Sequence, residues 1–87
     1  MADAAGAPLE LTLVSRLDCG LCEKFEAALA AFDVARSRWR LTVVDVDASP
    51  GLAARWGAKV PVLLMGEHEV CSLRFRPERL AALLTPA

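Results

Sequence analysis

The spacing of the apolar residues changes abruptly at one point in the sequence, from the alternation of a strand to the spacing of a helix. Two cysteines lie at this junction. Between Leu9 and Leu13 every second residue is a leucine, which is the pattern of a strand with one buried face. From Leu21 to Phe32 the apolar residues recur every three or four positions, which predicts an amphipathic helix. A strand that leads into a helix in this way is typical of the start of a β-α-β unit, so the junction favours an α/β fold.

The rest of the chain adds three strands and two helices. We expect strands at residues 41–46, 62–65 and 69–75, a short helix at 52–56 and a final helix that opens at Pro77. Ser49 and Pro50 form a helix start signal and Gly57 a stop. The strand at 41–46 is continuously apolar, which predicts burial on both faces. The order β-α-β-α-β-β-α predicts a mixed four-stranded sheet with helices on both faces.

The length and charge of the chain limit its organisation and its partners. With 87 residues we expect one domain at 9–87, preceded by a flexible tail at 1–8. A net charge of −1 argues against nucleic acid as a partner. No stretch reaches the roughly 20 apolar residues of a membrane span. The first eight residues carry no Lys or Arg, unlike a secretory signal, so we expect a cytoplasmic protein without a structural disulfide framework.

Cys19 and Cys22 form a Cys-x-x-Cys pair where the first strand ends and the first helix begins. The free backbone N–H groups and the dipole at a helix start favour an anion, so we expect a stabilised thiolate at Cys19. Cys22 lies one turn further on and can close a disulfide with Cys19, with Gly20 expected to allow the tight turn between them. Such a pair within a β-α-β pattern is typical of a thioredoxin-like redox site. We therefore predict Cys19 as the attacking nucleophile and Cys22 as the resolving thiol.

Four more residues are candidates for contact with a substrate. Val60 and Pro61 lead into the third strand, and a cis bond between them would place the Val60 backbone beside the thiols. An exposed backbone of that kind can pair with an extended substrate as an added strand. We expect Lys59 to steer an acidic partner. We expect the positive charge of Arg16 to favour the Cys19 thiolate and the negative charge of Asp18 to disfavour it. The net effect of these two charges on the thiolate stays open.

Several segments together resemble the glutaredoxin-like family of small bacterial thioredoxin-fold proteins. They are Leu13-Val14-Ser15-Arg16, Cys19-Gly20-Leu21-Cys22-Glu23, Val44-Asp45-Val46-Asp47, Val60-Pro61-Val62 and Arg76-Pro77-Glu78-Arg79-Leu80. The resemblance covers nearly the whole chain, from about Leu9 to Leu84. It implies a thioredoxin-like α/β fold with Cys19 and Cys22 as the redox pair and Pro61 as the cis-proline that faces them.

The resemblance also implies a function in cell redox homeostasis. The expected partners are a protein or small molecule that contains a disulfide, and a thiol reductant such as glutathione. Glutathione-using glutaredoxins hold glutathione with a Gly-Gly and an Asp after the fourth strand, whereas residues 71–75 here read Cys-Ser-Leu-Arg-Phe. We therefore expect dithiol–disulfide exchange without a bound cofactor or metal, and the motif that would hold glutathione is missing.

Two other functions fit some of the residues. A thioredoxin-like domain could act as a non-enzymatic module that binds a protein through the edge at Val60 and Pro61. A zinc-handling protein is the second alternative, because four residues supply ligand types that suit zinc. These are Cys19, Cys22, His68 and Cys71. Strand parity places Cys71 on an inward face, which favours simple packing as the role of the third thiol.

Overall fold

The computed structural model describes residues 8–32 and 38–84 of the chain. The elements in order are β1 (Leu9–Ser15), α2 (Gly20–Ala31), β2 (Trp39–Asp45), the 3-10 helix η2 (Val46–Ala48), α3 (Pro50–Trp56), β3 (Val62–Met65), β4 (His68–Ser72) and α4 (Pro77–Leu84). The predicted β-α-β-α-β-β-α order is confirmed, with η2 added between β2 and α3. Residues 1–7 of the predicted tail lie outside the described residues. Within the described ranges, no helix has both the length and the apolar character needed to cross a bilayer.

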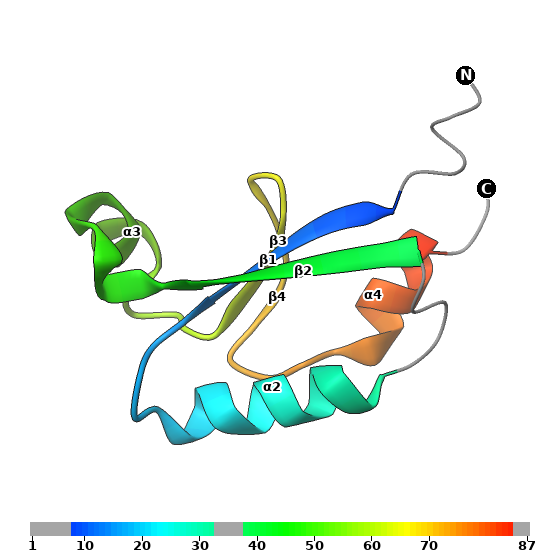
Figure 1. Ribbon diagram of the computed structural model, residues 1–87, viewed down its shortest axis with the longest axis horizontal. Coiled ribbons are helices and arrows are strands. Elements are labelled where there is room, and N and C mark those ends of the chain that lie inside the picture. The colour runs from blue at the N-terminus through cyan, green and yellow to red at the C-terminus, as the bar shows by residue number, and fades with distance from the viewer. Residues whose placement is uncertain (1–7, 33–37, 85–87) are drawn as a thin grey trace.

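The strands form one mixed sheet in the order β2-β1-β3-β4. β1 pairs in parallel with β2 and antiparallel with β3, and β3 pairs antiparallel with β4. Figure 1 shows α2 and α4 on one side of this sheet and α3 on the other. The predicted fold class, a mixed four-stranded sheet with helices on both faces, is therefore confirmed.

Each face of the sheet has its own hydrophobic core. The α2-side core contains buried residues from the sheet, α2 and α4, among them Leu11, Leu13, Phe25, Leu29, Leu63, Cys71 and Leu80. The α3-side core contains Val14, Cys22, Val46, Trp56, Val60, Val62 and Leu64. The central strand β1 contributes to both cores, because alternate side chains of a strand point to opposite faces. The loop that follows β1 therefore leaves from an interior strand of the sheet.

The local helix signals predicted from the sequence are confirmed at α3 and α4. The Ser49 hydroxyl accepts a hydrogen bond from the Leu52 N–H at 3.1 Å, Pro50 opens α3 and Gly57 ends it. Pro77 opens α4 in the same way. Because α3 is held at both ends, its last residue, Trp56, is fixed in the α3-side core.

Two expectations about strands are wrong. The second strand was expected to be buried on both faces, but β2 is an edge strand and its Val43 is 52% exposed. The fourth strand was expected to continue to Phe75, but β4 ends at Ser72. Leu73 has a positive φ of 69° and donates its N–H to the Pro61 carbonyl at 2.8 Å, so the chain turns out of the sheet there.

Candidate functional site

Cys19 lies between β1 and α2 as the N-cap residue of the helix. Its backbone is extended, and its Sγ accepts a hydrogen bond from the backbone N–H of Cys22 at 3.2 Å. The residue is half-buried. The expectation that Gly20 makes the tight turn is wrong, because Asp18 has the positive φ of 55° and Gly20 is an ordinary first residue of the helix. The predicted position of Cys19 at the helix start is confirmed.

Cys22 has a different environment, one turn into α2. It is 1% exposed and belongs to the α3-side core. Burial raises the pKa of the Cys22 thiol, the neighbouring Cys19 sulfur acts in the same direction, and a hydrogen bond with the Ser15 hydroxyl lowers it. The balance is a raised pKa, so Cys22 is a protonated thiol at neutral pH. The pair thus combines a half-buried cysteine at the helix start with a buried cysteine one turn further on.

Ser15 and Glu26 are site residues that the sequence analysis missed. Ser15 is the last residue of β1, is only 6% exposed, and donates its hydroxyl hydrogen to Glu26 Oε2 at 2.9 Å. The signal was present in the alternation of β1, because Ser15 follows Leu11 and Leu13 at the inward positions. A polar residue at the last inward position, just before a cysteine pair, indicates a polar contact next to the thiols.

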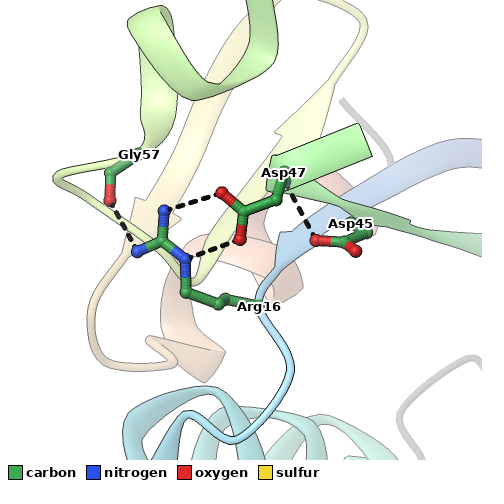
Figure 2. A network of polar contacts seen from close by, with 4 residues as sticks. All are labelled: Arg16, Asp45, Asp47 and Gly57. Carbon is green, nitrogen blue, oxygen red and sulfur yellow. Dashed lines mark hydrogen bonds and ion pairs between the residues drawn. The ribbon is translucent and has the colours of Figure 1, made fainter. Parts of the chain in front are cut away.

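Arg16 follows Ser15 and joins three segments of the chain, as Figure 2 shows. Its Nε and Nη2 donate to the two carboxylate oxygens of Asp47 at 3.0 and 3.3 Å, and its Nη1 donates to the Gly57 carbonyl at 3.2 Å. Asp45 supports this arrangement by accepting the Asp47 N–H at 2.9 Å. The two-pronged contact holds the start of the cysteine loop against η2 and the end of α3.

The electrostatics of Arg16 connect this network to the cysteines. The hydrogen bond and charge of Asp47 raise the pKa of Arg16, and Cys19 and Cys22 add smaller effects in the same direction. The hydrogen bond from Arg16 lowers the pKa of Asp47. A hydrogen bond from the Arg16 backbone also lowers the pKa of Cys22, against the larger effect of burial. From the sequence we expected Arg16 to favour the thiolate and to contact a substrate. No sequence pattern indicated that Arg16 pairs with Asp47.

Val60 and Pro61 lie beside the cysteines. Val60 packs in the α3-side core together with Cys22, and Cys19 contacts the same core. The peptide bond between Val60 and Pro61 is cis, and both side chains are buried. The structure therefore brings Val60 to the predicted redox pair from a position about forty residues later in the sequence.

Lys59 is engaged with its own chain. Its Nζ pairs with Glu69 and also lies 5.8 Å from the centre of the Trp56 ring. The hydrogen bond from Lys59, followed by one from Ser72, lowers the pKa of Glu69. An acidic partner would have to compete with Glu69 for this lysine.

The structure separates the residues of the alternative zinc set. Cys71 is fully buried in the α2-side core, where burial raises the pKa of its thiol, whereas Cys22 belongs to the α3-side core. His68 is exposed at the start of β4. Among residues 8–32 and 38–84, no group of three His, Cys, Asp or Glu side chains is placed to hold a metal ion. The structure therefore does not bring the four residues of the proposed zinc set together, and the packing role predicted for Cys71 agrees with its burial.

The fold and the site together define a class of protein. A mixed four-stranded sheet carries helices on both faces, and a Cys-x-x-Cys pair occupies the first turn of the helix that follows the central strand. These are the features of a thioredoxin-like domain. The family is more specific: a model of the Glutaredoxin-like domain (DUF836) matches residues 10–85. The chain belongs to this glutaredoxin-like family, and its cysteine pair points to a thiol redox function.

Solved structures agree with this assignment. A crystal structure of a protein from X. campestris is 33% identical, with a TM-score of 0.66, over 87% of this chain and 99% of that one. A solution structure of a protein from Nitrosomonas europaea is 29% identical, with a TM-score of 0.75, over 90% of this chain and 93% of that one.

A plant glutaredoxin shows the fold from a greater distance. The holo form of glutaredoxin C1 from Populus tremula × tremuloides is 18% identical, with a TM-score of 0.51, over 91% of this chain and 75% of that one. At this identity the likeness shows the thioredoxin-like fold alone. A search of curated protein sequences finds no match to this chain.

Proposed function

We propose that this protein is a small cytoplasmic thiol–disulfide oxidoreductase that acts through Cys19 and Cys22. The Cys19 thiolate attacks one sulfur of a substrate disulfide, forms a mixed disulfide and releases the other sulfur as a thiol. Cys22 then loses its proton and attacks the Cys19 sulfur, which forms the Cys19–Cys22 disulfide and releases the second substrate thiol. Two electrons pass from the protein dithiol to the substrate.

The observation that carries this proposal is the asymmetry of the two thiols. Cys19 is half-buried and its sulfur accepts the Cys22 N–H at a helix start, whereas Cys22 is buried and has a raised pKa. A nucleophile must be accessible and able to carry negative charge. A resolving thiol must instead be close to the nucleophile and shielded from outside disulfides. The positions of the two residues support these roles in that order.

Substrate is proposed to bind at the Val60 segment and to be guided by nearby charge. An extended segment of the substrate would pair with the Val60 backbone, because the Pro61 carbonyl already accepts the Leu73 N–H. Leu17 and Leu21, which flank Cys19, are 78% and 52% exposed and offer apolar contacts to a protein substrate. In this proposal Arg16 acts by favouring the thiolate and not by binding substrate.

The oxidised pair needs an external electron donor. We propose a thiol of the glutathione class, another glutaredoxin or a thioredoxin reductase as this donor, and no resident cofactor or metal. One donor thiol attacks the Cys19–Cys22 disulfide and forms a mixed disulfide, and a second donor thiol attacks that mixed disulfide, so the donor leaves as a disulfide and both cysteines return to thiols.

A redox equilibrium titration tests the proposed function. The protein is held in glutathione buffers of graded potential, quenched with an alkylating agent and mapped by mass. We expect one two-electron couple that joins Cys19 to Cys22, at about −120 to −270 mV. Cys22→Ser should accumulate a mixed disulfide at Cys19, and Cys19→Ser should form none. If both thiols stay reduced throughout, or oxidise only in mixtures with Cys71, the non-enzymatic binding module becomes the better account.

A further inference from the structure

Two surface grooves begin beside Cys19, on different faces of α2. The first groove lies between α2 and β2, and its lining includes Leu17 and Glu23. The second groove lies between α2 and the segment that follows β4, and its lining includes Leu21 and Lys24. The residues that flank the cysteine in the sequence thus belong to separate grooves. A substrate segment bonded to Cys19 therefore has one groove on each side of it.

The exposed apolar side chains of the protein are concentrated in these two grooves. Within the described part of the chain, every large apolar side chain that is exposed lines one groove or the other. Leu17 and Val43 line the first groove, and Leu21 and Leu73 line the second. Exposed apolar surface that is gathered beside a reactive group, and not scattered over the molecule, indicates a contact surface for a partner.

The two grooves carry charges of opposite sign. The first, the acidic groove, contains four carboxylates and the guanidinium of Arg16, which is already paired with Asp47. The carboxylates are those of Asp18, Glu23, Glu26 and Asp45. The second, the basic groove, contains Lys24 and Arg74, and none of the described residues that line it has a carboxylate. Among the described residues, neither of these cations forms an ion pair, so both are available to a partner.

We propose that the two grooves select a protein substrate that has basic residues on one side of its disulfide cysteine and acidic residues on the other. This inference rests on the proposed function and adds a substrate class to it. The basic side of the segment lies in the acidic groove, beside Glu23, and the acidic side lies in the basic groove, beside Lys24. A segment with the reverse order of charges places like charges together in both grooves, which disfavours its binding.

Peptides that differ only in the order of their charges test this proposal. Each peptide has blocked ends and a central cysteine that is joined to thiopyridine by a disulfide bond. One peptide has two lysines before the cysteine and two glutamates after it, and the other has the same residues in the reverse order. The Cys19 thiolate bonds to the peptide sulfur, the bond between the peptide and thiopyridine breaks, and the thiopyridine sulfur leaves with the electron pair. The absorbance of free thiopyridine gives the rate constant of this step.

The reduced wild-type protein should react faster with one order of charges than with the other. At low salt we expect about a tenfold preference, because an exposed charge pair typically contributes a factor of about 1.4 to 5 and each peptide places such pairs in both grooves. In 1 M salt the screening length falls to about 3 Å, so the preference should nearly disappear. The preferred order also gives the direction in which the substrate segment crosses α2.

A swap of two charges within α2 provides the matched variant. Glu23→Lys combined with Lys24→Glu keeps the net charge but weakens the charge of both grooves, so the preference should fall to about threefold or less. Rates are divided by the rate with neutral dipyridyl disulfide, which cancels any change in the reactivity of Cys19. Glu10 and Arg40 form an ion pair at the other end of β1. The control variant, Glu10→Lys combined with Arg40→Glu, should keep the full preference.

The outcomes separate this proposal from the proposed function. Equal rates for the two peptides in the wild-type protein, or a preference that survives 1 M salt, would overturn selection by charge. A full preference in the variant with swapped charges would overturn it as well. The proposed function would still stand in these cases if neutral dipyridyl disulfide reacts with the protein. Conversely, release of thiopyridine by Cys19→Ser at the wild-type rate would overturn the proposed function itself.

Discussion

The dual role of Cys19, as proposed nucleophile and as N-cap, makes a prediction that does not depend on any substrate. We compare Cys19→Ser with Cys19→Ala in the full chain. Both substitutions remove the reactive sulfur, so redox chemistry at this position cannot separate them. Serine keeps a side-chain oxygen that can accept the Cys22 N–H, whereas alanine leaves that N–H without its present partner.

The size of the difference follows from the one hydrogen bond that is lost. Replacing a serine N-cap with alanine typically costs about 1 kcal/mol. For a domain of 60–100 residues, 1 kcal/mol shifts Tm by about 4–8 °C. We therefore expect Cys19→Ser to melt about 4–8 °C above Cys19→Ala. The wild-type protein should lie between them, because a cysteine sulfur is a weaker acceptor than a hydroxyl oxygen.

Thermal unfolding under reducing conditions, followed by circular dichroism, measures this difference. Urea unfolding gives an independent value, and an equal slope in both variants would show that the comparison concerns stability alone. If Cys19→Ala is as stable as Cys19→Ser, the side chain at this position does not cap α2. The argument that places the sulfur at the positive end of the helix would then fail.

Three further predictions concern the remaining thiols and one ion pair. Iodoacetamide should modify Cys19 in the native reduced protein, and Cys22 and Cys71 only after unfolding, as mass mapping would show; rapid native labelling of Cys71 would contradict its burial. Cys71→Ala should leave the redox couple of the pair unchanged while costing about 1 kcal/mol of buried contact, measured by urea unfolding; a shifted couple would give the third thiol a redox role. The hydrogen bond from Lys59 lowers the pKa of Glu69 in the folded protein. The Glu69 carboxylate therefore stabilises the fold fully above its unfolded pKa of about 4.3. This stabilisation is lost as the pH falls through the lower pKa of the folded protein. Glu69→Gln should therefore lower Tm at pH 6 more than at about pH 3, and an equal effect at both pH values would refute the linkage.

Local signals in the sequence were sufficient for much of the fold. Ser49, Pro50 and Gly57 act within one helix, so their positions predict α3 without knowledge of the rest of the molecule. The period change before Cys19 likewise predicts the end of β1 and the start of α2. The order of the elements then follows along the chain.

The error about β2 and the missed partners of Arg16 concern properties that depend on distant neighbours. The apolar run of β2 could not show that this strand lies at a sheet edge, because edge position depends on which strands pair later in the chain. The partners of Arg16 are 31 and 41 residues away, and no pattern around Arg16 indicates them. Ser15 differs, because it continues the alternation of β1 and could have been recognised from the sequence.

The Arg16 network also bears on how the chain is synthesised. A ribosome releases the N-terminal part of a protein first, so Cys19 and Cys22 emerge before Asp47 and Gly57, which hold the loop in front of them. β3, the antiparallel neighbour of β1, is made later still. A nascent chain therefore carries both thiols before the framework that orders them exists. For that interval the surrounding redox conditions, and not the fold, protect the pair from incorrect disulfides.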